Sequence, residues 1–280
     1  MGKIIEGDKI ALKLFKEIKD EVSKLNRAPV LGVVLVGNNF ASASYVKGKI
    51  KAGKKVGIEV KVFDYPQTAT ESEILEKIQN LNNDEEVDGI IVQLPLPVHL
   101  NESIVVNSVR SSKDVDGFTF YNAGRLFRGK PLFKPCTPKG ILHMLRESNI
   151  EVANKHVVVV GRSNLVGLPL SRLFVEADAT VSICHSKTKN LEAITSQADI
   201  LCVAIGQKEF IKSKHVKKGA VVIDVGINRD DNNKLVGDVD FNDVFEKVSY
   251  ITPVPKGVGP LTISMLLMNT LSAYKGDFYE

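Results

Sequence analysis

Cysteine is scarce in the sequence, and its placement excludes two common roles. Cys136, Cys184 and Cys202 lie far apart and no CxxC pair occurs, so neither a disulfide framework nor a zinc knuckle is indicated. None of the five histidines stands at a spacing typical of metal ligands. We therefore expect reduced thiols, a cytoplasmic protein and no bound metal.

Long apolar runs and an excess of one charge are also missing. No run approaches the roughly 20 apolar residues of a membrane-spanning helix, and the first nine residues lack the apolar core of a signal peptide. The 37 Lys and Arg residues oppose 33 Asp and Glu residues and leave a net charge of only +4. That balance argues against a nucleic-acid or membrane partner, but it suits an anionic small molecule.

What the chain does contain is an alternation of short apolar runs with amphipathic helical patterns. Its 280 residues, 44% apolar and 25% charged, are enough for one large domain or two ordinary domains with a sizeable core. In the first half we expect strands at 31–36, 59–63 and 89–94 and helices at 41–56 and 71–81. This alternation predicts an α/β fold with parallel strands and helices on both faces of the sheet.

The pattern breaks at 113–138, where Gly, Pro, Asn and Lys are frequent, and we interpret this stretch as loop and linker. A second α/β block follows, which predicts two α/β domains. Ligands bind at the carboxyl ends of parallel strands, so the facing strand ends of two such domains would flank a cleft. The elements expected in the second block are a helix at 139–147, strands at 156–160, 179–184, 200–205 and 220–225, and a final helix at 262–274.

The segment VVVVGRSNLVGLP, from Val157 to Pro169, has the features of a nucleotide site. A buried strand runs into a turn and a helix, and Gly161, Ser163 and Gly167 are small where backbone N–H groups must approach a phosphate. The spacing G-x-S-x-x-x-G departs from the usual G-x-G-x-x-G. An ordinary tight turn between a strand and a helix would have the same small residues.

The end of the next strand indicates which dinucleotide would bind. NAD sites place an Asp or Glu there for the ribose 2′-hydroxyl, about 20 residues past the glycine-rich turn. Here Ser186 and Lys187 occupy that position, and Arg162 lies in the first loop. A hydroxyl and positive charges suit a 2′-phosphate and favour NADP over NAD. As an alternative, Lys187 is a solvated loop charge.

Two residues on the helix at 41–56 form a candidate acid–base pair. Tyr45 and Lys49 are four residues apart and share one face, and burial would lower the pKa of Lys49 toward the range useful for proton transfer. The alternative is a solvated basic face. Four further lysines lie on the same helix, namely Lys47, Lys51, Lys54 and Lys55.

Polar residues also stand at the end of the strand at 89–94 and in the loop that follows. Gln93 comes directly before the LPLP segment, where its amide would point into the cleft or satisfy local backbone groups. Asp114 and Asp116 belong to the KDVDG loop, and most acids in such loops cap a turn. An acid that faced the cleft would bind a ring with adjacent N–H donors, such as a pterin.

Taken together, seven segments of the chain resemble the bifunctional methylenetetrahydrofolate dehydrogenase/cyclohydrolase family. They occur in the family's order and cover nearly the whole chain, although each alone is only moderately specific. The segments are SASYVKGKIKAGKKVGI (42–58), VDGIIVQLPLP (87–97), KDVDGF (113–118), PCTPKG (135–140), VVGRSNLVGLP (159–169), CHSKT (184–188) and PVPKGVGPLT (253–262).

The resemblance implies oxidation of methylenetetrahydrofolate with NADP, followed by hydrolysis of the methenyl product to 10-formyltetrahydrofolate in one-carbon metabolism. Lys49 would be the central acid–base group, and Gln93 would hydrogen-bond it and tune its protonation. Tyr45 would pack on the pterin, and Asp116 would bind the edge of the pterin ring. These four residues would thus serve both catalysis and substrate binding.

The resemblance also implies partners and domain bounds. The partners would be tetrahydrofolate derivatives, with or without a polyglutamate tail, and a second copy of the chain in a homodimer paired through the nucleotide domain. Residues 1–146 and 264–280 would form the catalytic domain, because the last helix packs back onto it, and 147–263 would form the NADP-binding domain. NADP would contact Gly161, Arg162, Ser163, Gly167, Ser186 and Ile227, and the substrate would lie near Pro253, Gly257 and Pro260.

Two departures from the family pattern leave alternatives open. Lys256 replaces a glycine of the usual PGGVGP loop and would be strained if that position has a positive φ. The segment at 37–40 lacks the usual Asp and Pro. One alternative is a chain that has lost hydride transfer because of Lys256. Others are a shikimate-type NADP dehydrogenase, which leaves the residues assigned to the folate unexplained, and a non-catalytic folate or nucleotide binder, against which the presence of Lys49 argues.

Overall fold

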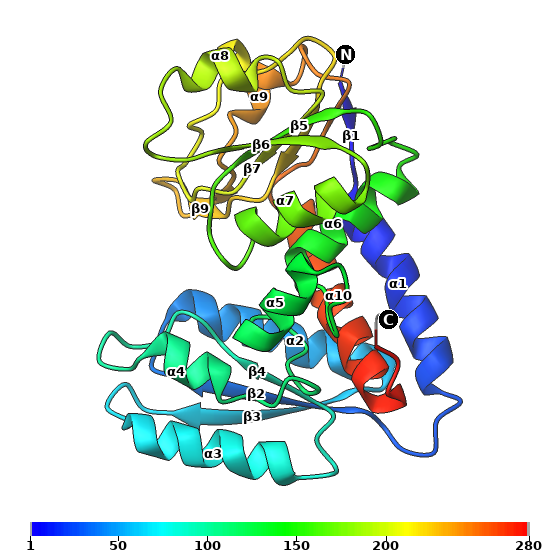
Figure 1. Cartoon of the computed structure of the whole chain (residues 1–280), viewed down its shortest axis with the longest axis vertical. Helices are drawn as coiled ribbons and strands as arrows, with labels where there is room; N and C mark the ends of the chain where they lie inside the picture. Colours follow the sequence, from blue (N-terminus) through cyan, green and yellow to red (C-terminus); the bar gives the residue numbers. More distant parts are fainter. Residues whose placement is uncertain (1, 279–280) are drawn as a thin grey trace. The chain divides into compact units, whose positions relative to one another are not determined.

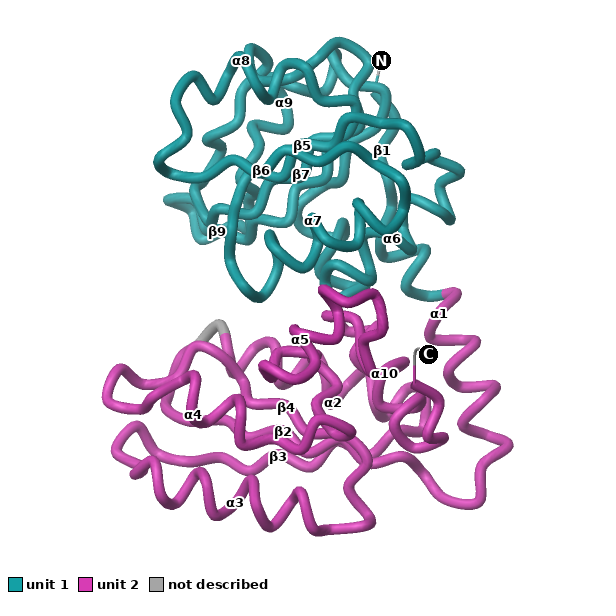
Figure 2. Tube along the Cα trace, viewed as in Figure 1, with its two compact units in different colours: residues 1–12, 137–262 teal, residues 13–136, 263–280 magenta. Residues whose placement is uncertain are grey.

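The computed structural model describes residues 2–278, apart from the side chains of Phe40 and Ala41. The chain divides into two compact units, which are coloured separately in Figure 2. Unit 1 contains Met1–Leu12 and Thr137–Thr262, and unit 2 contains Lys13–Cys136 and Ile263–Glu280. These bounds differ from the expected domains, in which the first 12 residues and 137–146 belong to the catalytic part.

Unit 2 is organised around a three-stranded parallel sheet. Its strands are β2 (Val30–Val36), β3 (Glu59–Tyr65) and β4 (Gly89–Val92), in the order β3-β2-β4. The central strand β2 is buried along its whole length, as expected of a parallel strand that is covered on both faces. Figure 1 shows helix α2 (Phe40–Val56) on one face of this sheet and α3 (Glu71–Asn83) on the other. Each of these five elements lies within two residues of its expected bounds.

The stretch interpreted as loop and linker at 113–138 is partly helical, so that prediction is wrong. Helix α5 (Phe120–Phe127) lies inside it, and α6 (Cys136–Glu147) begins before it ends. Helix α5 starts where the Thr119 side chain accepts the backbone N–H of Asn122 and so caps the first turn. A capping contact of this kind is not visible in the composition of the segment, which is why the frequent Gly and Asn residues suggest a loop.

Unit 1 contains a six-stranded sheet in which every neighbouring pair of strands is parallel. Its strands are β1 (Lys3–Ile4), β5 (His156–Val160), β6 (Thr180–Cys184), β7 (Ile200–Val203), β8 (Val221–Asp224) and β11 (Tyr250–Ile251). They run in the order β1-β11-β8-β7-β5-β6, with the chain leaving β5 for one side and later crossing to the other. This is the doubly wound arrangement of Rossmann-type domains, and it confirms the predicted class of the second domain.

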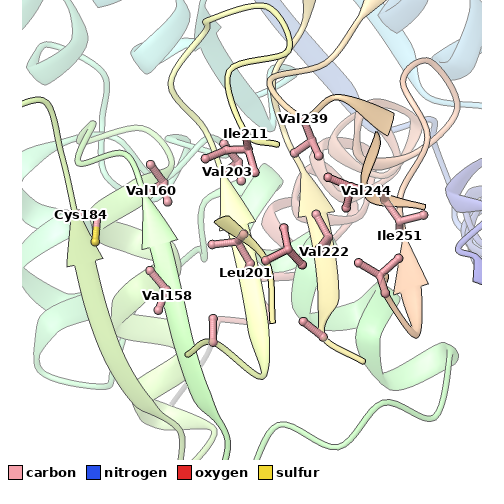
Figure 3. Packing of buried hydrophobic residues seen from close by; sticks show 14 residues of the cluster. Val158, Val160, Cys184, Leu201, Val203, Ile211, Val222, Val239, Val244 and Ile251 are labelled. Atoms are coloured by element: carbon pink, nitrogen blue, oxygen red, sulfur yellow. The ribbon is translucent and has the colours of Figure 1, made fainter. Parts of the chain in front are cut away.

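A valine-rich core covers one face of this sheet. Alternate residues of a strand point to the same side, so Leu201 and Val203 of β7 lie beside Val222 of β8 and the valines of β5 (Figure 3). Helices α8 (Leu191–Thr195) and α9 (Phe241–Val244) pack against these side chains. Burial of each branched side chain contributes roughly 1.5–3 kcal/mol, and it holds the strand ends in place for the loops that follow them.

The N-terminal segment supplies two elements that are not among those expected from the sequence. Strand β1 pairs with β11, with Lys3 opposite Tyr250, and this pairing is why the first residues belong to unit 1. Helix α1 (Gly7–Val22) follows and has a buried face with the spacing of an amphipathic helix. The buried residues of that face are Ala11, Leu14, Ile18 and Val22.

The last helix, α10 (Val258–Lys275), begins four residues before its expected start, and its residues from Ile263 onward belong to unit 2. Within residues 2–278, no helix combines the length and apolar character needed to cross a membrane. The remaining elements are α4 (Glu102–Asn107), α7 (Gly167–Glu176), a 3-10 turn at Ser213–His215, and an antiparallel hairpin of β9 (Asn228–Arg229) and β10 (Leu235–Val236).

Candidate active site

Helix α2 carries the first two candidate residues, and both of its ends are capped. The Asn39 side chain accepts the backbone N–H of Ser42 at 3.0 Å, which satisfies one of the free donors at the start of the helix. Gly57 ends the helix with a φ of 85°, a value that favours glycine. Asn39 therefore caps α2 in the segment that lacks the family's usual Asp and Pro.

Burial separates Lys49 from the other lysines of α2. Lys49 is 8% exposed, whereas the other four lysines of the helix are exposed. Its ammonium group donates a hydrogen bond of 2.8 Å to the side-chain oxygen of Gln93. The solvated basic face is thus present on this helix, but Lys49 is not part of it.

Gln93 follows directly after β4, and hydrogen bonds fix both its backbone and its side chain. Its backbone N–H donates to the carbonyl oxygen of Val34 at 2.8 Å, and its Nε2 donates to the carbonyl oxygen of Leu94 at 2.8 Å. The side-chain oxygen is therefore directed toward Lys49. Because an amide oxygen is a neutral acceptor, it orients the lysine without adding a charge.

Burial shifts the two charged groups of the site in opposite directions. Burial lowers the pKa of Lys49, and the negative charge of Asp116 opposes this change. Burial raises the pKa of Asp116, and the positive charge of Lys49 opposes that change. Both shifts favour the neutral form of the group. A neutral lysine is a proton acceptor, so the arrangement suits acid–base chemistry.

The two acids of the KDVDG loop have separate structural surroundings. Asp114 is buried and accepts the backbone N–H groups of residues 117–119 at 2.9–3.1 Å, together with the side-chain Nδ2 of Asn122 at 2.8 Å. It caps the turn, as most acids in such loops do. The Asp116 carboxylate instead lies 3.5 Å from the thiol of Cys136 and in the field of Lys49.

Cys136 and Asn269 belong to this site although neither is among the predicted site residues. The Cys136 thiol contacts Asp116, and the fully buried side chain of Asn269 on α10 donates to the carbonyl oxygens of Val115 at 2.8 Å and Lys134 at 3.1 Å. These bonds tie together the two segments that position Asp116 and Cys136. The PCTPKG motif is a signal for Cys136, whereas no local pattern marks Asn269.

Tyr45 lies one helical turn before Lys49 and is half-buried, and burial raises its pKa. A neutral phenol ring of this kind packs well against a flat ring and keeps a polar end for hydrogen bonding. The four predicted residues thus all belong to unit 2, where Lys49 interacts with both Gln93 and Asp116. Among residues 2–278, no group of three or more His, Cys, Asp or Glu side chains is placed to hold a metal ion.

Unit 1 has a cavity of about 290 Å³ at the carboxyl ends of its central strands, where the strand-end rule places nucleotides. Three predicted cofactor residues, Gly161, Arg162 and Ser186, line this cavity. Among the described residues, Ser163, Gly167 and Ile227 are not part of the lining. The lining also includes His185, Ala204, Ile205, Gln207 and Phe210.

The turn after β5 is tight because two glycines allow close backbone approach. Gly161 has a φ of 128°, and a Cβ atom there would lie 2.3 Å from the carbonyl oxygen of Ala204. A Cβ atom on Gly167 would lie 2.2 Å from the carbonyl oxygen of Gly161. The Ser163 hydroxyl accepts the backbone N–H groups of Val166 and Gly167 at 3.2 and 3.4 Å. The small residues of the motif therefore shape the turn that places Arg162 at the cavity.

The segment after β6 forms a small turn that presents Ser186 and Lys187. The backbone N–H of His185 donates to the Thr188 hydroxyl at 2.8 Å, and that of Lys187 donates to Nδ1 of His185 at 3.1 Å. Ser186, Lys187 and Arg162 are all exposed. A hydroxyl and positive charges thus stand where an NAD site would hold an acid, and these residues fit a 2′-phosphate.

The predicted substrate residues Pro253, Gly257 and Pro260 belong to unit 1, in the loop after β11 and the first turn of α10. A Cβ atom on Gly257 would lie 2.4 Å from the carbonyl oxygen of Pro253. Lys256 has a φ of 79°, so the residue that replaces the family's usual glycine is in the left-handed region, and the expected strain is confirmed. Its side chain is exposed, and its carbonyl oxygen accepts the backbone N–H of Asp8 at 3.0 Å.

Family models match both parts of the chain. The catalytic domain of the tetrahydrofolate dehydrogenase/cyclohydrolase family matches residues 5–116. The NAD(P)-binding domain of the same family matches residues 135–278. A shikimate-type dehydrogenase is therefore excluded, because the match extends to the part that carries Lys49, Gln93 and Asp116.

Individual relatives are similar along their whole lengths. The bifunctional protein FolD of Bacillus cytotoxicus is 50% identical over 275 residues, which are 97% of this chain and 96% of that protein. The structure of the bifunctional FolD dehydrogenase/cyclohydrolase from Campylobacter jejuni has a TM-score of 0.96 at 44% identity and covers 99% of each chain. The Trypanosoma brucei enzyme, complexed with NADP cofactor and an inhibitor, has a TM-score of 0.94 at 36% identity and covers 98% of each chain. The chain therefore belongs to the tetrahydrofolate dehydrogenase/cyclohydrolase family.

Proposed function

We propose that the protein oxidises 5,10-methylenetetrahydrofolate with NADP and then hydrolyses the methenyl product to 10-formyltetrahydrofolate. The observation that carries this proposal is the buried amine of Lys49, which hydrogen-bonds Gln93 and lies in the field of Asp116. Burying a lysine costs free energy, and groups with pKa values perturbed in this way are typical of sites that transfer protons. Membership of the family in both parts of the chain supports the same activity.

Bound NADP would accept a hydride from the methylene carbon of the folate. This step depends on proximity and orientation more than on acid or base. The contribution of unit 2 is therefore to hold the folate in one orientation. The Asp116 carboxylate accepts hydrogen bonds from adjacent N–H donors of the pterin, and the half-buried ring of Tyr45 packs against the pterin.

Hydrolysis of the methenyl cation requires two proton transfers, and Lys49 performs both. The neutral amine takes a proton from water as the C–O bond forms. The resulting ammonium gives a proton to the ring nitrogen as the C–N bond breaks, while the hydroxyl proton of the adduct leaves to solvent, so one proton is released per turnover. Gln93 keeps the amine oriented because its own amide is fixed by the Leu94 carbonyl.

NADP is proposed over NAD because Arg162 and Ser186 line the cavity in unit 1. Guanidinium and hydroxyl donors form charge-assisted hydrogen bonds with a 2′-phosphate. Ile227, which is exposed after the end of β8, is a further proposed cofactor contact. We further propose that the protein is a homodimer, which sedimentation velocity tests. It would act in one-carbon metabolism in the cytoplasm.

The test follows the two reactions separately in the purified protein. Methylenetetrahydrofolate is mixed with NADP or with NAD, and reduced cofactor and methenyl product are measured over time. Formation of NADPH together with 10-formyltetrahydrofolate supports the proposal. If no reduced cofactor forms while added methenyltetrahydrofolate is hydrolysed, the chain is a cyclohydrolase only. The loss of hydride transfer would then be attributed first to Lys256. If neither reaction exceeds the uncatalysed rate, the protein is a binder rather than an enzyme.

A further inference from the structure

Two buried aspartates of unit 1 lie outside the residues assigned so far. Asp224 ends strand β8 and is 4% exposed, and Asp238 follows the β9–β10 hairpin and is fully buried. A buried carboxylate is costly in free energy unless its oxygen atoms are hydrogen-bonded. The groups that these two acids bind therefore indicate why they are there.

Asp238 binds the loop that follows strand β7. Its Oδ2 accepts the backbone N–H groups of Ile205 at 2.7 Å and Gly206 at 3.0 Å, and its Oδ1 accepts that of Gln207 at 2.8 Å. Oδ1 also accepts the side-chain Nδ2 of Asn228 at 2.9 Å. Because a carboxylate has about four acceptor positions, the acceptor capacity of Asp238 is used in holding the loops after β7 and β8.

Asp224 in turn fixes the backbone around Asp238. Its Oδ1 accepts the backbone N–H groups of Gly226 at 3.0 Å and Asp238 at 2.9 Å, and its Oδ2 accepts that of Val239 at 3.0 Å. Two glycines leave room for the acids. A Cβ atom on Gly226 would lie 2.1 Å from the carboxyl carbon of Asp238, and one on Gly237 would lie 1.7 Å from Oδ2 of Asp224. Asp238 therefore packs against Gly226 and Asp224 packs against Gly237, where a larger residue would clash with the acid.

Of the loops held in this way, the one after β7 lines the proposed cofactor site, and the one after β8 contains a proposed cofactor contact. Ala204, Ile205 and Gln207 line the cavity in unit 1, and the proposed contact Ile227 lies within the segment 226–228 that the acids bind. We propose that Asp224 and Asp238 are positioning residues for NADP, which fix the loops at 204–207 and 226–228 in the binding geometry before the cofactor arrives. This inference rests on the proposed function, because it requires that the cavity bind the dinucleotide.

The charge of Asp238 is required because every group bonded to its oxygens is a donor. Asparagine has nearly the same shape but only one acceptor oxygen. In Asp238→Asn, the amide NH₂ group would face either the N–H groups of Ile205 and Gly206 or those of Gln207 and Asn228. Donors cannot bond to each other, so the loop would shift, and ordering it again would weaken NADP binding.

The experiment compares Asp238→Asn with the wild type and with Asp231→Asn, which makes the same change at an exposed position of the same hairpin. We expect the Kd for NADP, measured by titration calorimetry, to rise about tenfold or more in Asp238→Asn and to stay within about twofold in Asp231→Asn. Hydrolysis of added methenyltetrahydrofolate, which needs no NADP, should remain near the wild-type rate in both variants. An equal loss of hydrolysis and of NADP affinity would overturn the proposal, because it would indicate a general folding defect.

A second measurement needs no variant. If the loop is fixed in advance, the backbone N–H groups of Ile205, Gly206 and Gln207 exchange slowly with deuterium in the wild-type protein without NADP. Fast exchange that becomes slow only when NADP is added would overturn the proposal. A wild-type protein that binds no NADP would refute the proposed function and this inference together. Unchanged NADP affinity in Asp238→Asn would refute the inference alone.

Discussion

The folate site of unit 2 and the cofactor cavity of unit 1 both depend on buried ionisable groups, but they use them differently. In unit 2, burial lowers the pKa of Lys49 and raises that of Asp116, and the Lys49 ammonium donates a hydrogen bond of 2.8 Å to the neutral amide oxygen of Gln93. In unit 1, four N–H donors surround the Asp238 carboxylate. A buried group whose proton can be exchanged serves chemistry, whereas one enclosed by donors serves positioning.

Asp224 stands between these two cases. Backbone N–H groups of residues 226, 238 and 239 act to lower its pKa, but burial outweighs them and raises the pKa to about 7. The negative charge of Asp238 adds to the increase. Substitutions at these positions distinguish buried groups that transfer protons from buried groups that hold loops in place.

Lys49→Met has the largest expected effect. Removal of the amine eliminates acid–base catalysis, so kcat for hydrolysis of methenyltetrahydrofolate should fall about a thousandfold. NADP affinity should be unchanged, because Lys49 belongs to unit 2. Lys51→Met removes an exposed lysine from the same helix and is the matched control. Similar losses in the two variants would assign the activity to the basic face instead of the buried amine.

Asp224→Asn should change how stability depends on pH. The folded protein binds the Asp224 proton more tightly than the unfolded chain, since the pKa is about 7 against an ordinary 3.8. The stability from this group is present below about pH 4 and is lost as the pH rises through about 7, a change of a few kcal/mol. Urea unfolding at about pH 5 and about pH 8 measures this slope, which the variant should lack. An equally steep slope in the variant would assign it to other groups.

Arg162→Gln should weaken NADP binding selectively. Loss of a charge-assisted hydrogen bond to the 2′-phosphate raises the KM for NADP about tenfold or more, while the KM for NAD changes little. Lys187→Gln separates the two interpretations of that lysine, because a solvated loop charge has little effect on either cofactor. Equal changes for NADP and NAD in Arg162→Gln would contradict recognition of the 2′-phosphate.

Asp116→Asn should shift the pH dependence of hydrolysis. The negative charge of Asp116 raises the pKa of Lys49, so its removal lowers that pKa further. The rising limb of the pH–rate profile, which reports formation of the neutral amine, should therefore move to lower pH. The KM for the folate should increase several-fold as a pterin contact is lost. A limb that does not move would exclude Lys49 as the titrating base.

Lys256→Gly should have the smallest effect, which is a gain in stability from the relief of backbone strain in unit 1. Glycine tolerates the φ of 79° at this position, so the variant should be more stable by about 1 kcal/mol, seen as a rise of a few degrees in Tm. Lys256→Gln retains the strain and removes the charge. If Lys256 impairs hydride transfer by its charge, each of the two variants restores hydride transfer. If only Lys256→Gly restores it, the effect is due to the strained backbone.

The regular elements could be predicted from the sequence where a period defines them. Strand β2 and helix α2 lie within a residue of their expected bounds, because a buried apolar run and a capped helix depend on local sequence. Helix α5 could not be predicted in this way, since the Thr119 cap and the Asp114 turn that start it are specific contacts. Strand β1 is two residues long and has no period at all.

For the candidate site, the sequence predicts the types of residue and their location at the ends of strands. Spacing places Tyr45 and Lys49 on one face, but it does not show which of the five lysines on the helix is buried. The family resemblance identifies Lys49 as that residue. Asn269 is beyond such reasoning because its partner Val115 is 154 residues away in the sequence. The Asp224 and Asp238 pair depends likewise on glycine clearances that only the fold makes visible.

The chain passes between the two units after Leu12, after Cys136 and after Thr262. Neither unit is therefore encoded by one continuous stretch of the gene. A stop codon anywhere before the codon of Tyr250 would truncate both units at once, because it would remove strand β11 from the sheet of unit 1 and Asn269, with the rest of α10, from unit 2. The two proposed activities are thus lost together by such a mutation, and neither half can be inherited as a separate module.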